Sequence, residues 1–201
     1  MCGADARARA WRRGVTPADI AATVVQALPQ AMCVSSLGTA TSALRSASGD
    51  GPHLYLGASM GSALAAAMGV AEAVPDRLIV ALLGDGELLM GASTLWSVSA
   101  YRPPNLIAVV LSDDTYTITG RQPLSSPPRF AQVAESLGGI AGLRVQYDHQ
   151  LRAALIQLPR PSLIEAEVTN PTWPGPSPFV DPAVVRLAFT ANAAGTTELS
   201  P

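Results

Sequence analysis

The chain has 201 residues, of which 48% are apolar and only 14% are charged. Its 13 Lys and Arg stand against 15 Asp and Glu, giving a net charge of −2. This length suits one ordinary domain with a real core, and the charge balance excludes an electrostatic footprint for nucleic acid. The excess of apolar residues can form a surface that another subunit covers.

Membrane and disulfide classes are also disfavoured. The low-charge region 51–74 is broken by proline, histidine, glycine and glutamate, and the N-terminal arm lacks an apolar signal core. Cys2 and Cys33 make no disulfide framework, and Cys33 lies in an apolar stretch typical of a buried thiol. We therefore expect a cytoplasmic protein that does not bind membranes.

Apolar and helical patterns alternate along the chain. Thr16 is a favourable helix cap, and Pro17 and Asp19 follow it in the first turn of a predicted helix. Strands are predicted at 31–35, 53–56, 78–83, 106–111, 143–146 and 162–168. Further helices are predicted at 38–47, 59–74, 88–101, 128–137 and 148–158. This alternation predicts an α/β fold with a doubly wound, mostly parallel sheet and helices on both faces.

The same pattern divides the chain into three segments. We expect an N-terminal arm at 1–15, one domain at 16–169 and a proline-rich C-terminal tail at 170–201. Prolines recur between 171 and 182, so the tail is expected to be extended and to cross a surface before a short helix near 184–191.

Acidic residues follow two consecutive apolar strands. Gly84-Asp85-Gly86 ends one strand, and Ser112-Asp113-Asp114 ends the next. Ligands of open α/β sheets bind beyond the carboxyl ends of the strands, so the two carboxylates are a plausible seat for a hard cation and its phosphate. The glycine-bracketed segment 57–61 brings a third strand end to the same crevice.

These motifs carry a family resemblance. Gly84-Asp85-Gly86 followed by the turn at 111–118 resembles the signature of thiamine-diphosphate-dependent enzymes. Segments 34–39, 54–61, 119–123 and 160–165 resemble, in order, blocks of the phosphonopyruvate and sulfopyruvate decarboxylases. The resemblance covers most of the chain and implies a thiamine-diphosphate-binding fold.

The resemblance implies a role for each matching residue. Asp85, Asp113 and the carbonyl of Thr115 would bind Mg²⁺, and Met60 would act as the wedge that bends the cofactor. The carbonyl of Ala58 and the N–H of Met60 would contact the aminopyrimidine. The full implied cofactor set is Thr39, Ala58, Ser59, Met60, Gly84, Asp85, Gly86, Glu87, Asp113, Thr115, Tyr116, Thr117 and Ile118.

Other readings of individual residues remain open. His53 opens the strand leading to Gly57 and is a candidate for catalysis at the crevice mouth, although a lone histidine is more often structural. Glu87 also fits a first-turn acid that stabilises a helix dipole, and Met60 also fits a core residue.

Two residues depart from the family pattern. Asp113 stands where the family usually has a neutral Asn, and the added negative charge calls for a compensating cation, with Arg121 the nearest candidate in sequence. Thr115 replaces a smaller residue, and a positive φ there would strain its β-branched side chain.

The implied activity is decarboxylation of a small anionic 2-oxo acid, such as a phosphono- or sulfopyruvate, with thiamine diphosphate and Mg²⁺. In this family the activating glutamate lies on a pyrimidine-binding domain, so we expect a separate pyrimidine-binding subunit in a hetero-oligomer. The predicted helices 59–74 and 88–101 are the expected contacts. The alternatives are a carboligase subunit, or a non-catalytic cofactor-binding or scaffold subunit, which Asp113 and Thr115 suggest.

Overall fold

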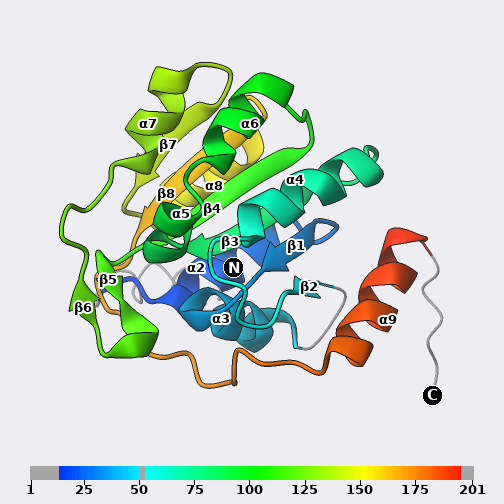
Figure 1. Ribbon diagram of the computed structural model, residues 1–201, viewed down its shortest axis with the longest axis horizontal. Helices are drawn as coiled ribbons and strands as arrows, with labels where there is room; N and C mark the ends of the chain where they lie inside the picture. The colour runs from blue at the N-terminus through cyan, green and yellow to red at the C-terminus, as the bar shows by residue number, and fades with distance from the viewer. Residues whose placement is uncertain (1–13, 50–52, 196–201) are drawn as a thin grey trace.

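A parallel six-stranded sheet forms the centre of the computed structural model, which describes residues 14–49 and 53–195 (Figure 1). The strand order is β2-β1-β3-β4-β8-β7, and every neighbouring pair is parallel. The bounds are β1 Met32–Ser35, β2 Leu54–Tyr55, β3 Ile79–Gly84, β4 Leu106–Ser112, β7 Ala141–Val145 and β8 Ser162–Glu167. The predicted doubly wound α/β fold is confirmed.

Helices cover both faces of this sheet (Figure 1). One face carries α2 Pro17–Ala27, α3 Gly38–Ser48 and α8 Asp148–Gln157. The other carries α4 Ala63–Ala73, α5 Asp85–Met90, α6 Thr94–Tyr101 and α7 Phe130–Leu137. A small hairpin of β5 Thr115–Tyr116 and β6 Gln122–Pro123, joined by the 3₁₀ turn η1 Thr117–Thr119, stands apart from the sheet.

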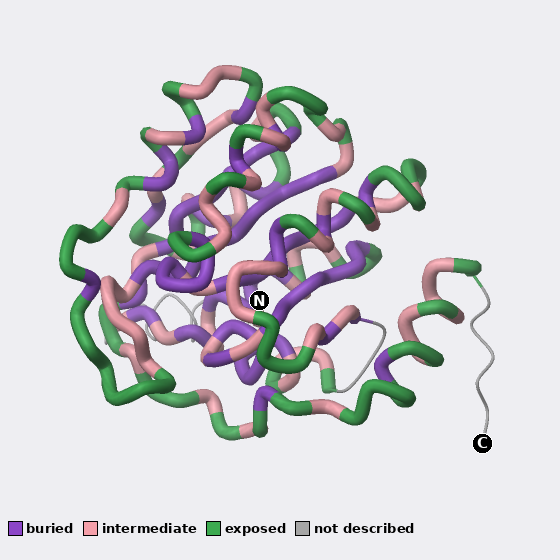
Figure 2. Tube along the Cα trace, in the orientation of Figure 1, coloured by how far each residue is buried: buried purple, intermediate pink, exposed green. Residues whose placement is uncertain are grey.

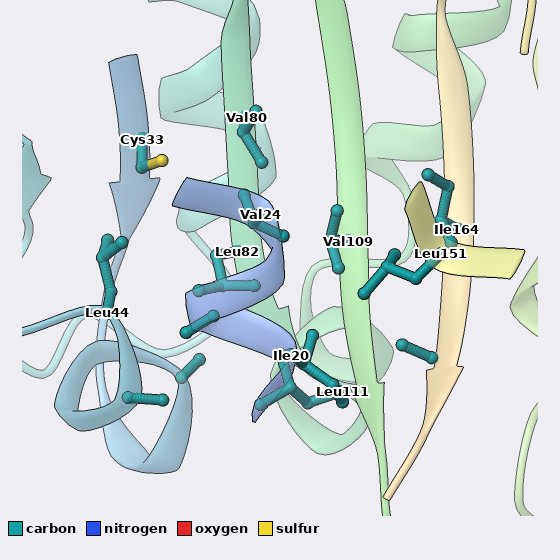
Figure 3. Packing of buried hydrophobic residues seen from close by; sticks show 14 of the residues in the cluster. Ile20, Val24, Cys33, Leu44, Val80, Leu82, Val109, Leu111, Leu151 and Ile164 are labelled. Atoms are coloured by element: carbon teal, nitrogen blue, oxygen red, sulfur yellow. The ribbon is translucent and has the colours of Figure 1, made fainter. Parts of the chain in front are cut away.

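Strand alternation produces two cores. In β3, Val80 and Leu82 face the layer that contains α2 and α3, whereas Ile79, Ala81 and Leu83 face the layer that contains α4. Figure 3 shows the first of these layers, in which side chains of α2, α3 and α8 pack on β1, β3, β4 and β8. The central strands are buried along their length in Figure 2 because both faces are covered.

The boundaries of two predicted helices are wrong. The expected helix at 88–101 is two helices, α5 and α6, separated at residues 91–93. The expected helix at 59–74 begins only at Ala63, because Gly57, Ala58 and Gly61 all have positive φ. Gly91 and Gly61 approach so closely that a Cβ on Gly91 would lie 2.1 Å from the carbonyl oxygen of Gly61. This backbone contact fixes the α5–α6 break against the loop before α4.

The two ends of the domain meet, and the tail follows the surface. The backbone N–H of Val15 donates to the Thr169 hydroxyl at 2.7 Å. The guanidinium of Arg45 donates to the carbonyls of Ser177 and Phe179 before the tail enters α9 Pro182–Ala193. Most of the predicted arm at 1–15, and Cys2 with it, lies outside the described residues, and the division into arm, domain and tail stays a prediction.

Among the helices of residues 14–49 and 53–195, none has both the length and the apolar character to cross a bilayer.

Two glycine-to-alanine substitutions test the contact between Gly61 and Gly91. We expect Gly91→Ala to lower the free energy of unfolding by about 2 kcal/mol or more, because the new methyl group meets backbone rather than a movable side chain. Gly69→Ala, in the interior of α4 with open space around it, should instead raise it by about 0.5–1 kcal/mol. Urea unfolding measures both; equal effects would contradict the close approach.

Candidate functional site

A pocket of about 140 Å³ opens where the strand order reverses between β1 and β3. Open α/β sheets bind their ligands at this switch point, beyond the carboxyl ends of the strands. The pocket is lined by the start of α3, the β3–α5 junction, Met60 from the loop before α4, and the hairpin. Its lining residues are Leu37, Gly38, Thr39, Ala40, Met60, Gly84, Asp85, Gly86, Glu87, Thr115, Tyr116, Thr117, Ile118 and Thr119.

The carboxylate of Asp85 joins the ends of β3 and β4. Its Oδ2 accepts the backbone N–H groups of Asp113 at 3.0 Å and Asp114 at 2.7 Å, and its Oδ1 accepts that of Gly86 at 2.6 Å. The side chain is buried, and this burial raises the pKa of Asp85 to about 7, against the lowering effect of the three backbone donors. Asp85 thus sets the spacing of the two acidic strand ends.

Asp113 folds the following turn onto itself. Its Oδ1 accepts from the backbone N–H and the hydroxyl of Thr115, each at 3.0 Å, and its Oδ2 accepts from the Thr117 hydroxyl at 2.9 Å. The positive φ in this turn is at Asp114, at 58°, rather than at Thr115, which lies in β5. Thr115 is therefore not strained in this way. The left-handed conformation is at Asp114 instead, and Asp is a residue type that tolerates it.

Glu87 connects three elements behind the pocket. Its Oε1 accepts from the Ser36 hydroxyl after β1 and from the backbone N–H of Ala63 at 3.3 Å, at the start of α4. Its Oε2 is buried without a hydrogen-bond partner among the described residues. Desolvation raises the pKa of Glu87 to about 7, although both donors lower it. This carboxylate is a cross-link rather than only a first-turn acid.

Glycines let the hairpin close over the pocket. A Cβ on Gly86 would lie 2.7 Å from Cε1 of Tyr116, and one on Gly38 would lie 3.2 Å from Cδ1 of Ile118. The Tyr116 ring therefore lies directly against the β3–α5 junction. The hairpin thus forms one wall of the pocket and lies against the first residue of α3 as well as against α5.

The loop before α4 is only partly brought to the pocket. Met60 lines it, whereas Ala58 and Ser59 are exposed and do not. Ala58 has a positive φ of 67°, and its carbonyl accepts the Met60 N–H at 3.0 Å. The two backbone groups that the family resemblance assigns to the aminopyrimidine are thus bonded to each other in this structure.

Two sequence-based expectations need correction. His53 does not line the pocket; it pairs through Nδ1 with the Cys33 N–H near the amino ends of β1 and β2, and the pocket lies at the opposite ends of the strands. Arg121 also does not line it, because its guanidinium donates to the Pro171 carbonyl at 3.0 Å. The sequence shows that both residues lie near the motifs. It does not show that His53 lies at the amino ends of the strands, or that Arg121 contacts Pro171.

Other pocket residues were not anticipated. Leu37, Gly38 and Ala40 flank the predicted Thr39, and Thr119 extends the predicted turn. The resemblance of segments 34–39 and 119–123 was the available signal for Leu37, Gly38 and Thr119, whereas Ala40 lies in neither segment. Among the residues that the structure describes, none of those lining the pocket is cationic, and no three His, Cys, Asp or Glu side chains gather closely enough to hold a metal.

Comparison with known proteins places these observations in a family. Residues 37–166 match the model described as thiamine pyrophosphate enzyme, C-terminal TPP binding domain. The chain is 35% identical over 131 residues to the phosphonopyruvate decarboxylase of Streptomyces hygroscopicus, a match covering 61% of this chain and 32% of that protein. It is 34% identical over 112 residues to the sulfopyruvate decarboxylase subunit beta of Methanothermobacter thermautotrophicus, covering 55% and 60%.

A solved structure agrees with these matches. The thiamine diphosphate-dependent 4-hydroxybenzoylformate decarboxylase of Rhodococcus jostii RHA1 superimposes with a TM-score of 0.62 and 27% identity over 79% of this chain and 33% of that one. The chain thus spans about a third of the length of the phosphonopyruvate decarboxylases it matches. The chain belongs to the family of thiamine-diphosphate-dependent enzymes, as a C-terminal-type thiamine-diphosphate-binding domain.

Proposed function

We propose that this chain is the diphosphate-binding subunit of a decarboxylase that acts on a small anionic 2-oxo acid with thiamine diphosphate and Mg²⁺. A separate pyrimidine-binding subunit completes the active site. The observation that carries the proposal is the pocket at the β1–β3 switch point, where Asp85 fixes the acidic ends of β3 and β4 beside the start of α3. Similarity to two decarboxylases of 2-oxo acids supports the reaction class.

The α3 end of the pocket fits a diphosphate. The N-cap residue Leu37 supplies no side-chain hydrogen bond to α3, and the first three residues of this helix line the pocket. Uncapped N–H groups at a helix N-terminus bind anions, and the helix dipole favours negative charge there. The hydroxyls of Thr39 and Thr117 on the lining are further donors for phosphate oxygens.

The charge of the pocket calls for a metal ion. Asp85 and Glu87 are the charged side chains of the described lining, and Asp113, which is outside this lining, accepts hydrogen bonds from Thr115 and Thr117. A diphosphate added to these carboxylates is repelled unless a cation intervenes. Carboxylate and carbonyl oxygens are the ligands that Mg²⁺ prefers, so Asp85, Asp113 and the Thr115 carbonyl are the proposed ligands.

The chain's own residues hold and shape the site, whereas thiamine diphosphate, when bound, supplies the nucleophilic carbon and the electron sink for loss of CO₂. The hairpin closes one side of the pocket, where Tyr116 lies against Gly86 and Ile118 lies against Gly38. Glu87 links α5 to Ser36, just after β1, and to Ala63, the first residue of α4. It therefore positions Met60, which lies three residues before Ala63. A partner subunit is supported by similarity to a subunit named beta.

Variants of Glu87 test this positioning role. We expect Glu87→Ala to lower the free energy of unfolding by about 1–3 kcal/mol, because the Ser36 hydroxyl and the Ala63 N–H lose their acceptor in a buried place. Glu87→Gln keeps one acceptor oxygen and removes a desolvated charge, so its loss should stay below about 1 kcal/mol. Denaturant unfolding distinguishes them, and a Glu87→Gln chain as unstable as Glu87→Ala would refute the cross-link.

Calorimetry with the cofactor tests the site itself. Thiamine diphosphate should bind to the chain more tightly when Mg²⁺ is present, because the described lining of the pocket offers carboxylates and no cationic side chain. Removal of Mg²⁺ with a chelator should weaken binding at least about tenfold, or about 1.4 kcal/mol. Tight binding without a divalent cation would contradict the charge argument.

Asp113→Asn is the matched variant for that experiment. The amide oxygen retains an acceptor for Thr115, and the variant carries one negative charge fewer beside the diphosphate. We expect folding to be unchanged and cofactor affinity to be equal or higher. A loss of binding in a folded Asp113→Asn chain would show that the charge of Asp113 is required.

Purification of the tagged chain from its host tests partner and reaction together. A co-purifying chain with a pyrimidine-binding domain is expected, and the assembly should release CO₂ and an aldehyde from phosphonopyruvate or sulfopyruvate. An acyloin product would identify a carboligase instead. A chain that purifies alone and binds no cofactor would support the scaffold alternative.

A further inference from the structure

A second pocket lies at the opposite edge of the sheet, at the amino ends of the strands. Its volume is about 260 Å³, and its lining includes Gln30 and Ala31 just before β1, and Arg77 two residues before β3. His53 and Cys33 form its inner wall, and α9 reaches it through Asn192. None of these residues belongs to the proposed cofactor site.

His53 presents an unused donor to this pocket. Only 6% of its surface is exposed, and its Nδ1 accepts the Cys33 N–H at 3.2 Å. Burial lowers the pKa of His53 to about 4, so the ring is neutral at pH 7. With Nδ1 acting as an acceptor, the single ring proton lies on Nε2. Among the described residues, no acceptor bonds to this Nε2–H, although the ring lines the pocket.

Arg77 brings a positive charge that no described carboxylate neutralises. Among the described residues its guanidinium donates to neutral acceptors: the Asn192 carbonyl at 3.0 Å, the Asn192 amide oxygen at 3.2 Å and the Gln30 carbonyl at 3.2 Å. A partly buried guanidinium usually pairs with an anion, because its charge is incompletely solvated. The pocket therefore combines a fixed cation with an unused N–H donor.

The other walls restrict what such an anion can be. Val25, Leu28 and Ala31 are apolar and face the same space. The volume lies below the roughly 300–1,000 Å³ of sites for drug-sized ligands, so the ligand must be small. A carboxylate on a short branched hydrocarbon is small, carries the negative charge that Arg77 and His53 call for, and has an apolar part for the other wall. Inorganic phosphate leaves the apolar wall unmatched.

We propose that this pocket binds a small aliphatic monocarboxylate, whose carboxylate accepts from His53 Nε2–H beside Arg77 and whose hydrocarbon part packs on Val25, Leu28 and Ala31. This site is independent of thiamine diphosphate binding. It lies beside the contact that ties α9 to the domain, so its occupant stabilises the folded chain by mass action.

Isobutyrate is the probe for the full chain, with isobutyramide as its uncharged isostere and inorganic phosphate as a second anion. Isobutyrate should shift the ¹⁵N resonance of His53 Nε2 saturably, with a dissociation constant on the order of millimolar. The exposed His149 is the internal reference and should not respond. Binding of isobutyramide as tight as that of isobutyrate, a response to phosphate alone, or no saturable shift would each overturn the proposal.

Two His53 variants separate the donor from the structural bond. His53→Asn can keep an acceptor for the Cys33 N–H but has no donor at the Nε2 position, whereas His53→Gln restores an N–H donor near that position. Saturation transfer to the isobutyrate methyl groups should show binding at least about tenfold weaker in His53→Asn and recovered in His53→Gln. Unchanged binding in His53→Asn would overturn the proposal, and the ligand comparison on the unmodified chain does so even if a variant fails to fold.

Discussion

The carboxylate of Asp85 holds the ends of the two central strands together, and the arrangement of the candidate site depends on this contact. Three backbone N–H groups converge on it, two of them from the turn after β4. Desolvation opposes a charge at this place, and the raised pKa of Asp85 reflects that balance. The hairpin follows directly from the turn, so its position over α3 and α5 is set by the same carboxylate.

Around this contact the site is rich in negative charge and in backbone donors. Glu87 is buried against Ser36 and Ala63, and Asp113 is enclosed by two threonine hydroxyls. A cation is thus the group that would join the acidic strand ends to an anion bound at the start of α3. This accounts for a pocket that contains carboxylates yet is proposed to bind a diphosphate.

Much of this arrangement could be predicted from the sequence. The unbroken apolar runs from Ile79 to Leu83 and from Leu106 to Leu111 predict buried parallel strands, and parallel strands bring Asp85 and Asp113 to one edge. The break between α5 and α6 could not be predicted, because it arises from the approach of Gly91 to Gly61, residues from different segments. Local helix propensity carries no information about such a contact.

The sequence also does not show at which edge of the sheet a residue lies, or which partner its side chain contacts. Only the register of β1 and β2 shows that His53 stands opposite Cys33, at the amino ends of the strands, and so belongs to a second pocket rather than to the cofactor site. The cross-link from Glu87 to Ser36 and Ala63 likewise joins residues far apart in sequence. In both cases the sequence identified the residue but not its partner.

The most direct test is a crystal structure of the chain with thiamine diphosphate and Mn²⁺ in place of Mg²⁺. The account predicts an anomalous peak for one Mn²⁺ between Asp85 and Asp113, with the diphosphate extending to the start of α3. A peak remote from these carboxylates, or a diphosphate bound elsewhere with the pocket at the β1–β3 switch point empty, would contradict it.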